Sequence, residues 1–117
     1  MWPVMADCER GLGNPLKALA LAGSPEVKRL AKAEEIEMRI VASGARRDLG
    51  QFDAAVITLT CRELKTDNAE WSVRLRYAYA DALEAAGRVA EAREWFAKCA
   101  QVDVEEVTDA LERSQHS

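Results

Sequence analysis

Hydrophobic residues recur at three- and four-residue steps through most of this chain, which is the spacing that places them on one face of an α-helix. One such series precedes Gly87 and consists of Trp71, Leu75, Ala78, Tyr79, Ala82 and Ala86. All three prolines lie within the first 25 residues, so the later chain contains no residue that must interrupt a helix. No stretch alternates between hydrophobic and polar residues as a half-buried strand would. The pattern therefore predicts an all-α protein.

Three glycines divide the helical chain at equal intervals. Gly13, Gly50 and Gly87 follow one another at intervals of 37 residues, and each is followed five positions later by an alanine. Such spacing indicates an internal repeat, and glycine suits the left-handed backbone that ends many helices. We therefore predict two antiparallel helix pairs, one joined at Gly50 and one at Gly87: Ala33–Leu49 with Phe52–Leu64, and Trp71–Ala86 with Val89–Ala100.

The N-terminal part of the chain is expected to depart from this plan. The sequence predicts a short helix over Pro15–Ala22, capped by Asn14 and ended by Gly23, and another short helix starting at Ser24 and Pro25. Residues 1–11 have too little hydrophobic periodicity to predict a helix. We assign residues 1–32 to an N-terminal tail with short helices.

The C-terminal part is expected to form a capping helix. Asp103 and Glu106 make a variant of the capping box and predict a helix that starts there. Its opposite faces are apolar at Val104, Val107, Ala110 and Leu111, and charged at Glu105, Glu106, Asp109, Glu112 and Arg113. Residues 33–117 are therefore expected to form a helical repeat domain with this terminal helix as its cap.

Large, small and aromatic residues occupy fixed positions around the two predicted turns. In the later repeat they are Tyr79, Ala80, Leu83, Gly87, Ala92, Phe96 and Cys99; in the earlier one they are Ala42, Ser43, Gly50, Phe52, Ala55 and Leu59. This arrangement resembles the tetratricopeptide repeat (TPR) family. The period of 37 residues exceeds the roughly 34 of that family, which leaves a related helical repeat as an alternative. The resemblance implies a right-handed α-solenoid of antiparallel helix pairs, with about two and a half repeats.

The resemblance also implies where a binding site lies. In TPR proteins the first helix of each pair lines a concave groove that holds a polypeptide. The 37-residue offset pairs equivalent positions on the two first helices: Glu37 with Arg74, Ile40 with Tyr77, Gly44 with Asp81, and Arg47 with Glu84. Arg74, Tyr77 and Asp81 are the strongest candidates, because arginine and tyrosine often dominate binding. The alternative is that these residues form solvated faces with local ion pairs.

Charge and hydropathy narrow the choice of partner. The net charge of −4 provides no overall positive field for nucleic acid, and acidic residues interrupt the local basic strip of Arg39, Arg46, Arg47, Arg74 and Arg76. No apolar run approaches the roughly 20 residues that a membrane-spanning helix needs. We therefore expect a protein or peptide partner, no membrane, and a cytoplasmic protein, with nucleic-acid binding as a less favoured alternative.

Catalytic chemistry has little support in the sequence. The single histidine, His116, lies in a polar tail, and no nucleophile-elbow, phosphate-binding or dinucleotide motif is present. Cys8, Cys61 and Cys99 are far apart, and the latter two are expected to pack as small hydrophobic residues. We predict a non-catalytic interaction module without metal or cofactor.

The predicted helix Ala33–Leu49 is apolar over more than one face and needs a cover. Two possibilities are equally open. The N-terminal segments could fold back on it through Leu16, Leu19, Leu21, Val27 and Leu30, with Trp2 and Val4 joining them. Alternatively, a second copy of the chain could cover it, which would make the protein a homodimerisation module.

Overall fold

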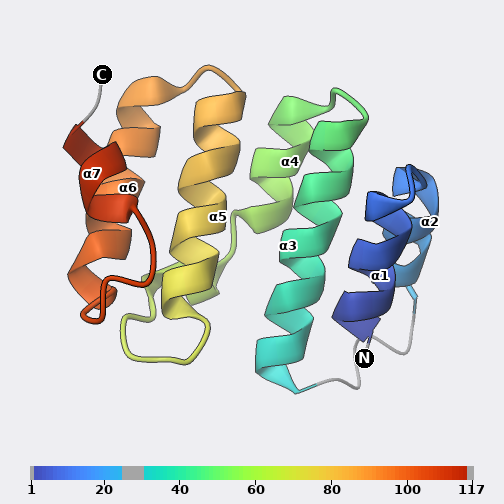
Figure 1. Ribbon diagram of the computed structural model, residues 1–117, viewed down its shortest axis with the longest axis horizontal. Coiled ribbons are helices and arrows are strands. Elements are labelled where there is room, and N and C mark those ends of the chain that lie inside the picture. The colour runs from blue at the N-terminus through green and yellow to red at the C-terminus, as the bar shows by residue number, and fades with distance from the viewer. Residues whose placement is uncertain (1, 25–30, 116–117) are drawn as a thin grey trace. The chain divides into compact units, whose positions relative to one another are not determined.

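The computed structural model describes residues 2–24 and 31–115, and within these ranges the chain forms helices and turns but no β-strand (Figure 1). The all-α prediction is confirmed for this part of the chain. The helices in chain order are α1 (Trp2–Gly11), α2 (Pro15–Ala22), α3 (Lys32–Asp48), α4 (Phe52–Leu59), the 3-10 helix η2 (Arg62–Lys65), α5 (Ser72–Ala85), α6 (Val89–Val102) and α7 (Ala110–Gln115).

The chain divides into two units, Met1–Leu59 and Thr60–Ser117. In the first unit α1, α2 and α3 pack against one another, and α4 packs against α3. In the second unit α5 packs against α6, and α7 packs against α6.

Three turns of the same kind join the helices of each pair. Gly13, Gly50 and Gly87 all have positive φ, at 80°, 75° and 81°. At the second turn the Gly50 amide donates to the carbonyl of Arg47 at 2.9 Å, and the Gln51 amide donates to the carbonyl of Arg46 at 2.8 Å. The equivalent two bonds close the turns at Gly13 and Gly87, which makes each a Schellman motif. The predicted turns at Gly50 and Gly87 are confirmed, and the turn at Gly13 is built in the same way.

The expectation that residues 1–11 lack a helix was wrong, because α1 spans Trp2–Gly11. Its buried residue is Ala6, at 0% exposure, while Val4 and Met5 are exposed. A small buried residue lets α1 approach its neighbours closely, and its described side chains form no hydrophobic stripe that periodicity would detect. The first glycine therefore has a helix on each side, like the other two.

The N-terminal helices fold back onto α3. Their common core contains Ala6, Ala18, Met38, Val41 and Ala45, with Leu19, Leu21 and Ala22 packed at its edge. The N-terminal segments therefore cover α3, which is the first of the two alternatives that the sequence left open. Leu16 and Val4 take no part, at 69% and 63% exposure, while Val27, Leu30, the helix expected from Ser24 and Pro25, and the side chain of Trp2 lie outside the described residues.

The predicted short helix over Pro15–Ala22 is confirmed, and Gly23 follows it. Asn14 stands before its first residue, but its side chain does not cap the helix. The amide nitrogen Nδ2 donates instead to the carboxylate of Glu9 in α1, at 3.2 Å. Proline at the first position already fits the helical backbone and has no N–H group to satisfy.

Small residues lie at equivalent places in all three pairs. Ala18, Ala55 and Ala92, on the second helices, are at most 1% exposed. On the first helices Ala6, Ser43 and Ala80 are similarly buried. These positions recur at the 37-residue period, so each pair uses the same close approach between helix backbones.

The helix that follows Gly50 is shorter than predicted. α4 ends at Leu59, and Leu64, which was expected in the same helix, is buried in η2. Thr58 lies at this end of the helix, and its hydroxyl donates to the carbonyl of Ala54 at 2.8 Å. Such back-bonding by threonine weakens a helix locally.

The prediction that a helix starts with a capping box at Asp103 was also wrong, since α7 begins at Ala110. The Asp103 carboxylate accepts hydrogen bonds from the amides of Val107 and Thr108, both at 2.9 Å, and from the Thr108 hydroxyl at 2.5 Å. Glu106 has a φ of 52°, which no right-handed helix allows. The carboxylate therefore closes an irregular loop between α6 and α7.

Candidate protein-binding site

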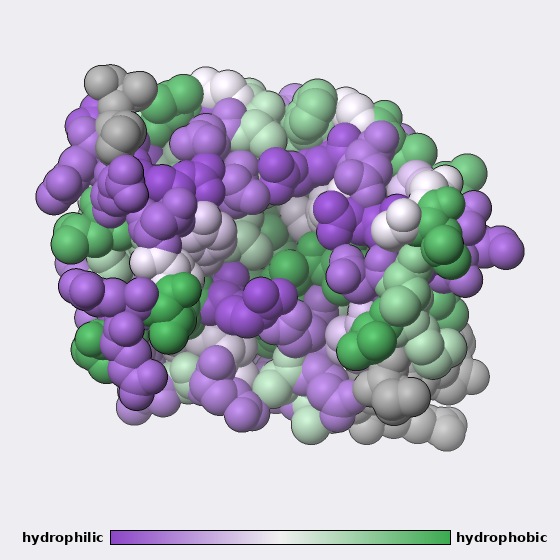
Figure 2. Space-filling model, viewed as in Figure 1, coloured by the Kyte–Doolittle hydropathy of each residue, from purple (hydrophilic) through white to green (hydrophobic). Residues whose placement is uncertain are grey.

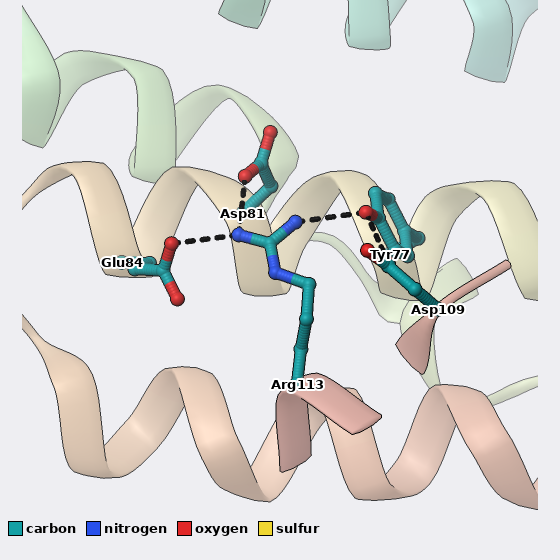
Figure 3. Close-up of polar contacts among 5 residues, drawn as sticks. All are labelled: Tyr77, Asp81, Glu84, Asp109 and Arg113. Carbon is teal, nitrogen blue, oxygen red and sulfur yellow. Dashed lines mark hydrogen bonds and ion pairs between the residues drawn. The ribbon is translucent and has the colours of Figure 1, made fainter. Parts of the chain in front are cut away.

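Three of the four candidates on α5 lie together around one arginine. Tyr77, Asp81 and Glu84 are spaced so that they share a face of the helix, and all three contact Arg113 of α7 (Figure 3). Arg74, one turn earlier on α5, is exposed. We call Tyr77, Asp81, Glu84 and the neighbouring Phe96 the arginine site.

The guanidinium of Arg113 uses two of its nitrogens in this site. Nη2 donates to Oδ1 of Asp81 at 2.9 Å and to Oε1 of Glu84 at 2.6 Å, while Nη1 donates to the Tyr77 hydroxyl at 2.8 Å. The Tyr77 hydroxyl in turn donates to Oδ1 of Asp109 at 2.6 Å. The arginine thus donates three charge-assisted hydrogen bonds from these two nitrogens.

Two aromatic rings complete the site. The central carbon of the Arg113 guanidinium lies 4.2 Å from the ring centre of Phe96 and 5.4 Å from that of Tyr77. The two rings meet edge to face, with centres 5.4 Å apart and planes at 71°. Phe96 comes from α6 and is fully buried, so the packing of α5 against α6 fixes the position of this ring beneath Arg113. Cation–π contacts of this kind favour a flat guanidinium.

The surroundings keep Arg113 charged and Tyr77 neutral. Desolvation of Arg113 opposes its charge, but the hydrogen bonds with Tyr77, Asp81 and Glu84 outweigh it and raise the pKa of the guanidinium. Burial, followed by the hydrogen bond with Asp109, raises the pKa of Tyr77. The tyrosine therefore keeps its proton at neutral pH and can donate to Asp109 while it accepts from Arg113.

The loop before α7 determines where Asp109 and Arg113 lie. Asp103 closes that loop, and its pKa is lowered by the hydrogen bond from the Thr108 hydroxyl and by those from the Thr108 and Val107 amides, although burial opposes this. The Thr108 hydroxyl also accepts from the amide of Ala110 at 3.2 Å, at the start of α7. Ala110 is fully buried. These contacts hold α7 where its arginine meets α5.

The candidates on α3 belong to the first unit. Glu37, Ile40 and Arg47 are half-buried there. Gly44 lies under the guanidinium of Arg10 from α1, since a Cβ at residue 44 would come within 2.7 Å of the central guanidinium carbon. Arg10 also donates to Asp48 at 2.6 Å. An arginine from another helix of the same unit thus lies against one candidate position on α3, Gly44, and contacts three candidates on α5.

The contacts of Arg113 and Asp109 were not predicted from the sequence, where both residues belonged to the charged face of the capping helix. A signal was present, because Arg39, Arg76 and Arg113 follow one another at the 37-residue period. Arg39 donates to the carbonyl of Thr58 at 3.1 Å, and Arg76 donates to that of Lys98 at 2.8 Å. In two pairs this arginine thus ties the first helix to the end of the second, whereas Arg113 contacts side chains of the preceding pair.

The hydrogen bonds of Arg39 and Arg76 also involve the local basic strip that was considered for nucleic-acid binding. Arg76 is 7% exposed, and its Nε also donates to the carbonyl of Leu64 at 3.2 Å. Arg39 is partly buried on the carbonyl of Thr58. Two of the five arginines in the strip therefore serve contacts within their own units.

The remaining sequence predictions concern metal binding, the cysteines, His116 and the membrane. Within residues 2–24 and 31–115, no group of three or more histidine, cysteine or acidic side chains could hold a metal ion. Cys99 is buried as predicted, and burial raises the pKa of its thiol to about 11. Cys61 is partly exposed, and His116 lies outside the described residues. No helix in the described part of the chain is long and apolar enough to cross a membrane.

Comparison with known proteins gives no match: no family model, no curated protein and no solved structure is significantly similar to this chain.

Proposed function

We propose that this chain is a non-catalytic interaction module that binds a peptide or protein on the polar face of its first helices. The observation that carries the proposal is the arginine site, where Tyr77, Asp81 and Glu84 together hold a side chain from a separate helix. A face that holds one segment of polypeptide has the chemistry to hold another.

The proposal includes a right-handed, TPR-like stacking of the helix pairs and a groove that contains Glu37, Ile40, Arg47, Arg74, Tyr77, Asp81 and Glu84. Two observations support it. The pairs share one kind of glycine turn, and they share buried small residues at the same period. Repetition of one packing unit is what a solenoid requires. A cytoplasmic location is also part of the proposal.

Site-specific crosslinking tests the binding face. A photoreactive phenylalanine analogue replaces Arg74, which is exposed on α5, and a control chain carries it at Ala97, which is exposed on α6. In the native host, we expect Arg74 to crosslink to a defined partner that Ala97 does not capture. Tyr77→Ala in the Arg74 chain should reduce that crosslink by about 10-fold, since a central tyrosine often dominates binding. Identical capture from both positions would contradict the proposed face.

Self-association is the second candidate function, and a specific observation favours it. Val4 and Met5 of α1, Leu12 of the following turn and Leu16 of α2 are 45–75% exposed. Figure 2 shows hydrophobic residues at the surface in the region of α1 and α2. Exposed apolar patches often mark contacts between proteins. Sedimentation at tens of micromolar would reveal a dimer that Leu12→Ser with Leu16→Ser returns to monomer. A wild-type monomer at that concentration would rule this candidate out.

A further inference from the structure

α7 packs against α6, but few large hydrophobic side chains hold it. The helix has six residues, and Ala110 is its buried residue. Leu111 is 54% exposed, and Val104 and Val107 in the preceding loop are 85% and 71% exposed. Apolar burial therefore contributes little to holding the helix. Three hydrogen bonds of Arg113 attach the helix to α5, and one from Arg93 to the carbonyl of Ser114, at 3.5 Å, attaches it to α6.

The arginine site is built for a guanidinium rather than for any cation. Asp81 and Glu84 share one nitrogen of Arg113, the Tyr77 hydroxyl accepts from another, and the Phe96 ring lies against the flat face. A lysine ammonium is a compact charge that cannot match a planar fork and stack on a ring at the same time. Asp109 lies in the same segment as α7, so release of that segment would leave Tyr77, Asp81, Glu84 and Phe96 as the binding surface.

We propose that α7 is an intramolecular competitor: the arginine site binds an arginine side chain of a partner polypeptide, and Arg113 occupies the site until that partner replaces it. This inference rests on the proposed function and adds the chemistry of the ligand. Charge complementarity supports it, since two carboxylates face one cation in a chain of net charge −4. Tethering gives Arg113 an effective concentration of about millimolar, so the site is available only in the fraction of molecules in which α7 is released.

A peptide titration on the full chain tests the competitor. The probe is a fluorescein-labelled peptide with the sequence of residues 103–115, and its binding is followed by polarisation. We expect it to bind the Arg113→Ala chain at least about 10-fold more tightly than the wild type, because the variant no longer fills its own site. Ala110→Glu is a second variant that detaches α7 by placing a charge at a buried position, and it should have the same effect. Circular dichroism checks that both variants fold.

Two altered peptides test the chemistry. Citrulline in place of the peptide's arginine keeps the shape but removes the charge, and should weaken binding to the Arg113→Ala chain about 10-fold. Lysine keeps the charge but loses the planar fork, and should weaken it by a smaller factor. Asp81→Asn with Glu84→Gln in the receiving chain should remove the difference between arginine and citrulline.

Each failure has a distinct meaning. Equal binding of the arginine peptide to wild type and both variants, or no binding to any of them, would overturn the proposal that α7 is an intramolecular competitor. Equal binding of the arginine and citrulline peptides would overturn arginine recognition. Neither result decides the proposed function, which depends on the Tyr77-dependent crosslink at residue 74. Loss of that crosslink with normal peptide binding would overturn the proposed function alone.

Discussion

The Ser43 hydroxyl of α3 donates to the backbone carbonyl of Ala55 in α4 at 2.8 Å, with both residues buried. Ala80 and Ala92 occupy the equivalent positions in the next pair. The same helix crossing is therefore built with a hydrogen bond in one pair and without one in the other. Size, rather than polarity, is the requirement that the two crossings share.

Substitutions at Ser43 should separate these two contributions. Ser43→Ala removes one hydrogen bond and should lower the free energy of unfolding by about 0.5–1.5 kcal/mol. Ser43→Leu should cost about 1–3 kcal/mol or more, because it forces the helices apart. Urea denaturation measures both, with Ala80→Leu as the matched change in the other pair. A Ser43→Leu chain as stable as Ser43→Ala would contradict the close approach.

Replacement of Gly87 should destabilise the turn through the backbone alone. No atom lies within 4 Å of a Cβ placed there, but φ is 81°. Gly87→Val should therefore lose about 1–3 kcal/mol of stability, because a β-branched residue is strained in the left-handed region. Gly87→Asn is the control and should lose less, since asparagine tolerates this conformation. Thermal melts that coincide for glycine and valine would show that this turn is not strained.

Tyr77→Phe should loosen α7. The change removes the hydrogen bonds that the hydroxyl makes with Asp109 and Arg113 while it keeps the ring beside Phe96. We expect hydrogen exchange in residues 110–115 to accelerate by several-fold to about 10-fold, since local opening follows local stability. Tyr79→Phe is the control on the same helix, because the contact of Tyr79 with Trp95 is made by its ring. Acceleration by both variants would mean that α5 as a whole is weakened.

Asp103 should make the loop sensitive to acid. The lowered pKa of Asp103 means that the unfolded chain binds the proton more readily than the folded one. Its contribution is therefore complete above the unfolded pKa of about 3.9 and disappears as the pH falls through the lower folded value. Asp103→Asn should cost about 1–2 kcal/mol at pH 7, and its difference from wild type should shrink below pH 4. Asp67→Asn, at an exposed residue, is the control. A difference that stayed constant down to pH 2 would contradict this role.

The cysteines should react in order of their exposure. Cys8 is exposed, whereas Cys99 is buried, with its thiol on the carbonyl of Val73 at 3.4 Å. A pKa of about 11 leaves Cys99 protonated at pH 8, and the thiol is far less nucleophilic than the thiolate. Iodoacetamide should therefore modify Cys8 within minutes and Cys99 only after unfolding. Mass spectrometry of the alkylated peptides measures this, and early labelling of Cys99 would show that α6 opens readily.

The sequence predicted the turns because their physical requirement is local. A residue with positive φ between two helices is almost always glycine, so Gly50 and Gly87 were visible without any knowledge of packing. α1 was missed because Ala6 is the fully buried residue among its described side chains, and one small residue leaves no periodic pattern. The capping box at Asp103 failed because its carboxylate had other donors within reach, in Val107 and Thr108.

The arginine site was only half predictable. Tyr77, Asp81 and Glu84 could be chosen from their positions on one helix, as candidates for contact with a partner. Their contact with Arg113 joins residues about 30 positions apart, separated by α6 and the loop that follows it. A charged terminal helix normally indicates exposure to solvent. Only the recurrence of arginine at the 37-residue period pointed to Arg113, and that period did not predict which groups it would contact.

The three glycine turns also bear on the order in which the protein is assembled. Each is closed by hydrogen bonds between residues no more than five positions apart, and each pair of helices is contained within fewer than 40 residues. A nascent chain therefore has every partner that it needs for one pair before the next pair is translated. Arg113 follows α5 and α6 in the chain, so Tyr77, Asp81, Glu84 and Phe96 are synthesised before the segment whose arginine contacts them.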